Sequence, residues 1–201
     1  MSEQPDHYFT ARPASPAERR RQVVHLAGRD VEVDVAGGVF SPGGVDKGTR
    51  VLLAEVPDPP DGGHLLDLGC GWGPLAITMA SRAPHATVWA VDVNERALDL
   101  LRGTADRLGL TNLRAVTADQ VPDDVRFAAI WSNPPIRVGK SVLHDLLRTW
   151  LPRLDDAGAA WLVVAKNLGS DSLARWISAE LDVPVTRAAS AKGFRVLRVD
   201  R

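Results

Sequence analysis

The chain has 201 residues, of which 45% are hydrophobic and 24% charged, and a formal net charge of -1. This suits one domain of ordinary composition and excludes a general attraction to nucleic acid, so a polyanionic partner would have to meet a local basic patch. One cysteine, five scattered histidines and no run of about 18 apolar residues argue against a disulfide, a metal site and a membrane span, and predict a cytoplasmic protein.

The first part of the chain reads as an extension to a larger domain. Residues 1–22 are polar and rich in proline, with a basic run at 19–21, and residues 1–28 are predicted to form a flexible or helical lead-in. Residues 29–35 alternate charged and apolar side chains, the pattern of a half-exposed strand in a hairpin outside the main sheet. Residues 37–49 are rich in glycine, a helical stretch covers 51–56, and a linker follows at 57–63.

From residue 64 onward, apolar runs alternate with helical stretches. This alternation predicts parallel strands joined by right-handed crossovers, and therefore a doubly wound α/β sheet. The last segment, 183–199, reads as two strands with no helix between them, so an antiparallel hairpin should close one edge of the sheet. The predicted strands are 64–68, 87–92, 113–119, 127–132 and 159–165, and the predicted helices are 74–82, 95–108, 140–154 and 170–181.

A glycine turn follows the first of these strands, in the sequence D-L-G-C-G-W-G-P from Asp67 to Pro74. Such a turn at the carboxyl end of a strand is where open α/β sheets bind nucleotides. The dinucleotide pattern G-x-G-x-x-G would need glycine at 74, where proline stands. Asp67, two residues before Gly69, would repel a phosphate but can accept hydrogen bonds around a cationic ligand. The ligand that fits is S-adenosylmethionine.

Acidic residues end the next two strands. Asp92 lies about 20 residues past Gly69, the spacing of an acid that bonds ribose hydroxyls. Asp119 could receive the adenine amine. Each residue alone could equally be a helix cap or a turn residue. Together with the glycine loop, which includes Gly71, they predict a nucleoside site.

A corner of the sequence S-N-P-P-I-R-V-G-K follows the apolar run that ends at residue 132. The side-chain oxygen of Asn133 and the next backbone carbonyl, held by Pro134 and Pro135, can accept both hydrogens of an amine. That would orient the amine nitrogen for attack on a methyl group. The alternative is a plain strand terminator, since Asn-Pro is a common turn signal.

With these motifs, residues 30–201 resemble the S-adenosylmethionine-dependent class I methyltransferases of the methyltransferase small domain group, which have a Rossmann-like seven-stranded sheet. Within the group, the chain is most similar to ribosomal RNA guanine-N2 methyltransferases. The resemblance implies one methyltransferase domain over 29–201, with a hairpin and cofactor-covering loop in 29–60 and the Rossmann-like core in 64–201. It also implies S-adenosylmethionine as cofactor.

The resemblance also implies roles for particular residues. Asp67, Gly69 and Gly71 would line the methionine and ribose side, Asp92 and Asn94 the ribose, and Asp119 the adenine. Asn133, Pro134 and Pro135 would receive the amine, with Asn133 also in contact with the cofactor. The upstream F-S-x-x-x-x-D-x-G-T motif would cover the cofactor pocket, and its members here are Phe40, Ser41, Asp46, Gly48 and Thr49.

Two features depart from the family pattern, and both concern the identity of the methyl acceptor. Many amine methyltransferases carry an aromatic residue after the two prolines to stack on the base, and this chain has Ile136. The chain also lacks room for the extra domain that helps the ribosomal enzymes grip RNA, so it would dimerise, act on an exposed substrate, or rely on its own basic residues. Lys47, Arg137 and Lys140 are the candidates nearest the corner.

Three functions remain open from sequence. The first is methylation of an exocyclic amine in RNA, above all guanine N2 of ribosomal RNA. The second is methylation of a protein glutamine amide, for which related enzymes commonly carry tyrosine at the position of Ile136. The third is a catalytically silent scaffold that binds S-adenosylmethionine, which would have no need for Asn133.

Overall fold

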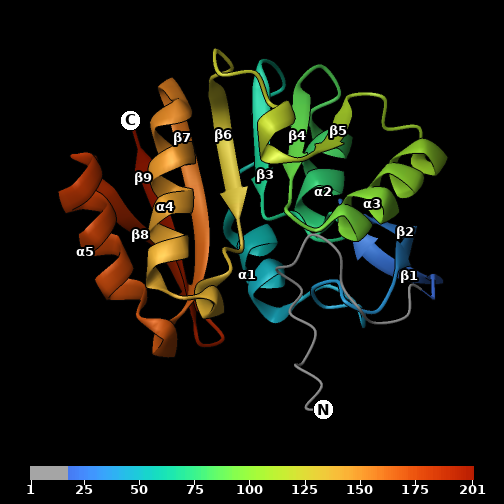
Figure 1. Ribbon diagram of the computed structural model, residues 1–201, viewed down its shortest axis with the longest axis horizontal. Helices are drawn as coiled ribbons and strands as arrows, with labels where there is room; N and C mark the ends of the chain where they lie inside the picture. The colour runs from blue at the N-terminus through green and yellow to red at the C-terminus, as the bar shows by residue number, and fades with distance from the viewer. Residues whose placement is uncertain (1–17) are drawn as a thin grey trace.

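The computed structural model describes residues 18–201, except for the side chain of Arg137. A seven-stranded sheet forms the centre, in the order β5-β4-β3-β6-β7-β9-β8, with a separate two-stranded hairpin (Figure 1). In the large sheet, only β9 runs in the direction opposite to the other strands. The predicted fold class, a doubly wound, mostly parallel sheet closed by an antiparallel hairpin, is therefore confirmed.

The strands of the large sheet are β3 (His64–Leu68), β4 (Thr87–Val91), β5 (Leu113–Val116), β6 (Phe127–Ser132), β7 (Leu154–Ala165), β8 (Val185–Ala191) and β9 (Phe194–Asp200), and the hairpin consists of β1 (Arg20–Leu26) and β2 (Arg29–Val35). The α-helices are α1 (Lys47–Glu55), α2 (Pro74–Arg82), α3 (Glu95–Leu108), α4 (Lys140–Trp150) and α5 (Ser170–Leu181). Short 3-10 turns are η1 (Ala118–Gln120), η2 (Ile136–Val138), η3 (Leu151–Arg153) and η4 (Lys166–Leu168).

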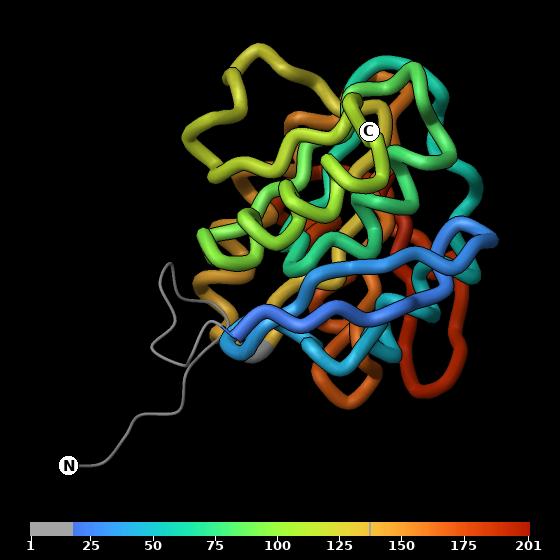
Figure 2. The backbone as a smooth tube through the Cα atoms, turned by 90° about the vertical axis from the view of Figure 1, so that its right-hand side faces the viewer, coloured from blue at the N-terminus to red at the C-terminus, as the bar shows by residue number. Residues whose placement is uncertain are grey.

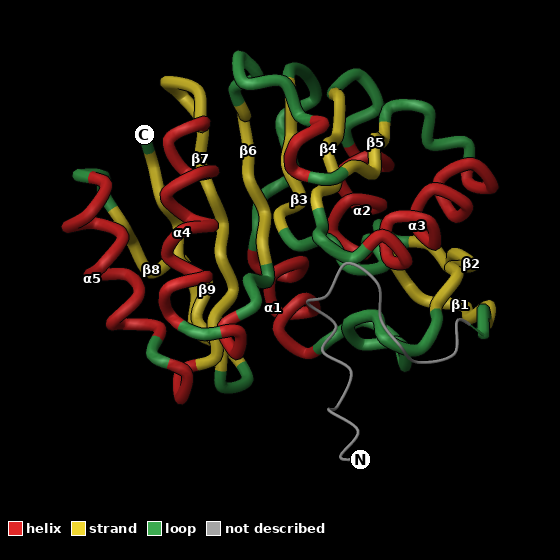
Figure 3. Tube along the Cα trace, in the orientation of Figure 1, coloured by secondary structure: helices red, strands yellow, loops and turns green. Residues whose placement is uncertain are grey.

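Helices cover both faces of the sheet (Figure 3). Alternate residues of each strand point to opposite faces, so Leu65 joins one apolar core with α1, α2 and α3, and Leu66 joins the other with α4 and α5. These two buried faces explain why the central strands β3, β4 and β6 are mostly apolar. The longest helix in the described residues has 14 residues, and none there is long and apolar enough to cross a membrane.

The hairpin corrects the prediction for the start of the chain. Residues 20–26, expected to be part of a flexible or helical lead-in, form β1, which pairs with β2 along its whole length (Figure 2). Sequence gives little sign of β1 because most of its side chains are exposed, including Val23 at 63%. Residues 1–17 of the predicted lead-in lie outside the described residues.

A partly buried ion pair ties the hairpin to the main domain. Asp34 of β2 is 7% exposed, and its carboxylate accepts a hydrogen bond from Arg107 of α3 at 2.8 Å. The backbone N–H of Asp34 also donates to the hydroxyl of Thr104, at 3.2 Å. The hairpin thus extends the same apolar core as α3, and it holds the following loop, 36–46, over the carboxyl edge of the sheet.

Candidate active site

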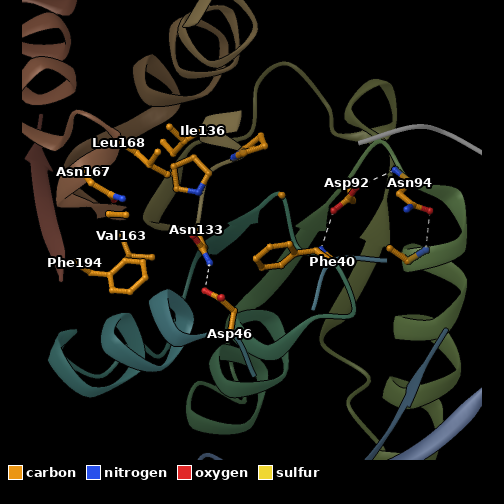
Figure 4. Close-up of a pocket in the computed structure, with 16 residues that line it drawn as sticks. Phe40, Asp46, Asp92, Asn94, Asn133, Ile136, Val163, Asn167, Leu168 and Phe194 are labelled. Atoms are coloured by element: carbon orange, nitrogen blue, oxygen red, sulfur yellow. Dashed lines mark hydrogen bonds between the residues drawn. The ribbon is translucent and has the colours of Figure 1, made fainter. Parts of the chain in front are cut away.

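One cavity of about 510 Å³ opens at the carboxyl ends of β3, β4, β6 and β7 (Figure 4). This is the edge at which open α/β sheets bind ligands. Asn133 lies in the middle of the view, with Asp92 and Asn94 on one side and Val163, Asn167 and Phe194 on the other. The cavity is lined by Phe40, Asp46, Gly69, Gly71, Asp92, Asn94, Ala97, Asn133, Pro134, Pro135, Ile136, Val163, Ala165, Asn167, Leu168 and Phe194. A smaller pocket beside it adds Thr49 and Asp67.

The glycine loop follows β3 and opens α2. The N–H groups of Gly69 and Cys70 donate to the carbonyl of Val91 at 2.8 and 3.0 Å, which pins the loop beside the end of β4. Gly73 has a φ of +92°, and a Cβ there would lie 2.3 Å from a methyl group of Leu101 in α3. Only glycine fits this position, so the loop and the packing of α2 on α3 are specified together.

Asp67 is a buried carboxylate with one oxygen unused. Its Oδ2 accepts the N–H of Ala76 at 2.9 Å, and its Oδ1 has no hydrogen-bond partner within the described part of the chain. Burial, opposed by the Ala76 bond and reinforced by the nearby Asp92 carboxylate, raises the pKa of Asp67 to about 8. A buried oxygen of this kind is suited to a cationic partner.

Asp92, directly after β4, faces the same loop. Its Oδ2 accepts the N–H of Gly71 at 2.8 Å and its Oδ1 accepts the N–H of Asn94 at 2.9 Å. Burial raises the pKa of Asp92, although these backbone bonds oppose the shift. Each carboxylate oxygen keeps a free lone pair, so Asp92 can still receive ligand hydroxyls.

Asn94 has a structural task in addition to lining the cavity. Its side-chain oxygen caps α3 by accepting the N–H of Ala97 at 3.2 Å. Its amide nitrogen donates to the carbonyl of Gly38 at 2.8 Å, which anchors the covering loop. With 1% of its surface exposed, Asn94 fixes the wall of the pocket.

The loop before α1 covers the glycine turn. Phe40 lies over Gly71, where an added Cβ would be 3.8 Å from the Phe40 Cβ. The indole N–H of buried Trp72 donates to the carbonyl of Ser41 at 3.1 Å. These contacts place the covering loop against the cavity, as the upstream motif had suggested.

The corner after β6 is organised around the amide of Asn133. Its nitrogen donates to Oδ2 of Asp46 at 3.0 Å and to the hydroxyl of Thr49 at 3.1 Å. The same Asp46 oxygen caps α1 by accepting the N–H groups of Gly48 and Thr49. A carboxylate can only accept, so the amide nitrogen must face Asp46. The side-chain oxygen of Asn133 therefore remains available to the cavity.

The prolines hold this corner in place. Pro134 and Pro135 are buried, and the carbonyl of Pro134 accepts the N–H of Ile136 at 2.8 Å. That carbonyl oxygen keeps a second lone pair. The hydroxyl of Ser132 donates to the carbonyl of Leu68 at 2.7 Å and fixes the end of β6 against β3.

Some of the residues expected at the site lie elsewhere. Asp119, expected at the adenine, is exposed in η1 and does not line either pocket. Lys47 and Lys140 are exposed at the first residues of α1 and α4, outside the cavity lining. The side chain of Arg137 lies outside the described residues. Sequence reasoning did not single out the lining residues at the end of β7, in η4 and at the start of β9, which are Val163, Ala165, Asn167, Leu168 and Phe194.

The lysines of the chain lie close along the sequence to residues that line this cavity. The chain contains four lysines in all, each exposed and each next to, or within a few residues of, a cavity-lining residue. We call this set, Lys47, Lys140, Lys166 and Lys192, the lysine rim. The hairpin turn that carries Lys192 meets the start of η4, since the N–H of Lys166 donates to the carbonyl of Gly193 at 2.9 Å. None of the four forms an ion pair within residues 18–201.

The residues on this edge fit S-adenosylmethionine. The unused oxygen of Asp67 suits an ammonium group, and Asp92 offers lone pairs to ribose hydroxyls. Among the side chains that the structure describes, no lysine or arginine lines the cavity to receive a phosphate. The fold and this site define a methyltransferase that uses S-adenosylmethionine.

The comparison with known proteins identifies the family. Residues 30–198 match the methyltransferase small domain, and the chain belongs to that family. It is 32% identical to the uncharacterized protein YbxB of Bacillus subtilis over 199 residues, which cover 98% of both chains.

The ribosomal RNA small subunit methyltransferases C are longer relatives. The enzyme of Pseudomonas aeruginosa is 37% identical over 131 residues, which cover 63% of this chain and 39% of the relative. That of Pseudomonas entomophila is 31% identical over 98% of this chain and 58% of the relative. The chain thus spans less than two thirds of these enzymes.

Among solved structures, the fold is similar to the Thermus thermophilus 16S rRNA N2 methyltransferase RsmC, solved with AdoMet and guanosine. The TM-score is 0.80 at 24% identity, over 92% of this chain and 51% of the other. This likeness confirms the Rossmann-like methyltransferase fold.

Proposed function

We propose that this methyltransferase modifies an exocyclic base amine in RNA, with guanine N2 of ribosomal RNA as the acceptor. The observation that carries the proposal is the amide of Asn133, whose two hydrogens are held by Asp46 and Thr49. Its oxygen is left for a donor in the cavity. An amine with two hydrogens is such a donor.

The corner would act by positioning the amine. The nitrogen lone pair of a base amine is conjugated with the ring and is a weak nucleophile. If Asn133 Oδ1 and the Pro134 carbonyl each accept one amine hydrogen, the lone pair is directed out of the ring plane. S-adenosylmethionine, when bound, supplies a methyl group on a sulfonium. Fixed φ angles at Pro134 and Pro135 keep the two acceptors rigid.

The cofactor contacts are part of the same proposal. Asp67 would receive the ammonium of the methionine moiety and Asp92 the ribose hydroxyls. Phe40 and the glycine loop at Gly69 and Gly71 would enclose the ligand between the covering loop and β3. Asp119 does not line the cavity, so its position assigns it no contact with the adenine.

RNA as the acceptor is supported by the lysine rim and by the names of the longer relatives. Exposed lysines around the mouth of the cavity could hold the phosphates on either side of an everted nucleotide. By contrast, the arginines at 195 and 198, in the last strand, form ion pairs with Asp171 and Asp200. A chain of this size could thus grip RNA with its own lysines, working in the compartment of the ribosome, the cytoplasm.

The two alternatives are separated from this proposal by particular residues. A glutamine amide could use the same corner, but it offers no flanking phosphates for the lysine rim. A silent scaffold would not require the hydrogen-bonded arrangement of Asp46, Thr49 and Asn133. We therefore place RNA amine methylation first.

The test is transfer of labelled methyl groups from S-adenosylmethionine into purified small ribosomal subunits and into a ribosome-depleted lysate. Half of each product is treated with RNase and half with protease, and the labelled RNA is digested to nucleosides. The proposal predicts RNase-sensitive label that migrates as N2-methylguanosine. Label removed only by protease would instead identify a protein acceptor.

A further inference from the structure

We propose that the half of the cavity between Ile136 and Phe194 holds the acceptor base, and that Phe194 provides the aromatic stacking surface. The proposal rests on the proposed function for the identity of the acceptor. Many related enzymes carry a base-stacking aromatic residue after the two prolines, and this chain has the aliphatic Ile136 there. An aromatic ring from a different strand would take over that role.

Phe194 and Ile136 pack against the apolar cores on opposite faces of the sheet. Phe194 packs against the core formed with α1, α2 and α3, whereas Ile136 packs against the core formed with α4 and α5. Both are half-buried and both line the cavity (Figure 4). A flat group that enters at this edge would therefore meet the ring on one side and the aliphatic chain on the other.

The ring of Phe194 is held close to the amine-orienting corner. A Cβ added at Gly48 would lie 3.0 Å from the Cε1 atom of Phe194, so the ring rests against the first turn of α1. Gly48 also donates its N–H to Asp46, the residue that holds Asn133. Glycine at 48 thus gives the ring room beside the corner.

The strand pairing explains how a distant residue reaches this place. Phe194, the first residue of β9, pairs with Ala165, the last residue of β7, and both line the cavity. Because β9 runs antiparallel to β7, its first residue lies at the carboxyl edge of the sheet. A parallel strand in that position would bring its last residue there instead.

A polar group completes this half of the cavity. Asn167 of η4 is exposed, lines the cavity and has no hydrogen bond to another described side chain or to the described backbone. Its amide offers both a donor and an acceptor to the edge of a base. The remaining lining of this half, Val163, Ala165 and Leu168, is apolar, as a purine face requires.

The experiment uses a short single-stranded RNA that carries one 2-aminopurine, a fluorescent base with an amine at the guanine N2 position. Stacking quenches its emission, so the complex with the wild-type protein should be dim. Phe194→Leu removes the ring and keeps an apolar side chain, while Phe194→Tyr keeps the ring. We expect brighter emission and about tenfold weaker RNA binding for Phe194→Leu, with wild-type behaviour for Phe194→Tyr.

Affinity for S-adenosylmethionine, measured by calorimetry on the same samples, serves as the control for folding and should stay within twofold of wild type in both variants. The proposed subsite would be contradicted if Phe194→Leu quenched 2-aminopurine emission and bound the RNA as the wild type does. It would also be contradicted if the wild type did not quench the emission. Its failure is distinct from that of the proposed function. Quenching that depends on Phe194 without N2-methylguanosine formation would uphold the subsite and reject the reaction.

Discussion

At the scale of single residues, Asp46 links the first helix to the reacting corner. One carboxylate oxygen caps α1 and receives the amide nitrogen of Asn133. Sequence placed Asp46 only in a motif that covers the cofactor. Its contact with Asn133 spans a long stretch of chain and could not be read from the sequence.

Asp46→Ala tests this link. One atom, Oδ2, both caps α1 and receives the amide of Asn133, so the alanine loses both contacts. We expect kcat to fall by about 10- to 100-fold, the usual loss when a positioning partner is removed, with little change in the Kd of S-adenosylmethionine. Single-turnover methyl transfer measures it. The matched control is Asp106→Ala, an exposed aspartate of α3, and a rate equal to that control would contradict the role.

If Asp67 receives the ammonium of the cofactor, as proposed, cofactor binding will depend on pH. Burial raises the pKa of Asp67 to about 8, so the free protein carries a proton on this carboxyl at pH 7. An ammonium beside Oδ1 would favour the carboxylate and lower that pKa. Binding at pH 7 should then release close to one proton, and affinity should increase as the pH rises toward 8.

Calorimetry in buffers of different ionisation enthalpy measures this release. Asp67→Asn should abolish it and weaken binding. The same pKa predicts that the free protein loses stability as the pH rises from about 4 to 8, because the unfolded carboxyl ionises first. A release that persists in Asp67→Asn would assign the proton to another group.

Other residue assignments show the limit of motif reasoning. Asp67, Asp92 and Asn133 were found because each ends a recognisable strand, and the structure brings all three to one edge. Asp119 was also expected to end a strand, but β5 ends at Val116 and Asp119 is exposed in η1. Phe194 carried no signal, since its place depends on the register between β7 and β9. Asn167 carried none because it lies in a short turn, η4, after β7.

At the scale of elements, hydrophobic periodicity predicted most helices and strands of the core correctly. The ranges predicted for α2, α3, α5, β3 and β6 agree with the structure. Helix α1 begins at Lys47, earlier than expected, because Asp46 caps it within a glycine-rich segment. The helix predicted over 140–154 ends at Trp150, and the chain passes through η3 into a longer β7.

The contact between the glycine loop and α3 gives a prediction at this scale. Gly73→Ala would place a methyl group 2.3 Å from Leu101 and force a non-glycine residue to a φ of +92°. We expect a loss of about 2 to 4 kcal/mol in the free energy of unfolding. Gly109→Ala, with a φ of +66° and no atom within 4 Å, is the control and should lose only about 1 kcal/mol. Denaturant titration decides between them, and equal losses would contradict the steric argument.

At the scale of the whole molecule, a net charge of -1 conceals an uneven distribution of lysines. The lysine rim surrounds the carboxyl edge, whereas Arg29, Arg82, Arg114 and Arg126 lie toward the opposite edge, at the starts of strands or the end of α2. Lys47 and Lys140 were singled out from the sequence, which could not show where the four lysines lie relative to the cavity.

Salt dependence of RNA binding tests the rim. Each phosphate contact to a single strand contributes about 0.7 to the slope of log K against log salt. Replacing the four rim lysines by glutamine should reduce the slope by up to about 3. Glutamine at the four arginines named above removes the same charge and should leave the slope nearly unchanged. Equal effects of the two sets would point to general electrostatic attraction instead.

The central claim is that the Asn133 corner orients an RNA amine for methylation, and Asn133→Ala tests it most directly. The measurement is the single-turnover rate of methyl transfer to small ribosomal subunits, with the Kd of S-adenosylmethionine determined alongside. We predict a fall of at least about 100-fold in the rate with the affinity nearly retained, as for loss of an interaction made in the transition state. A rate within a few-fold of wild type would contradict the account.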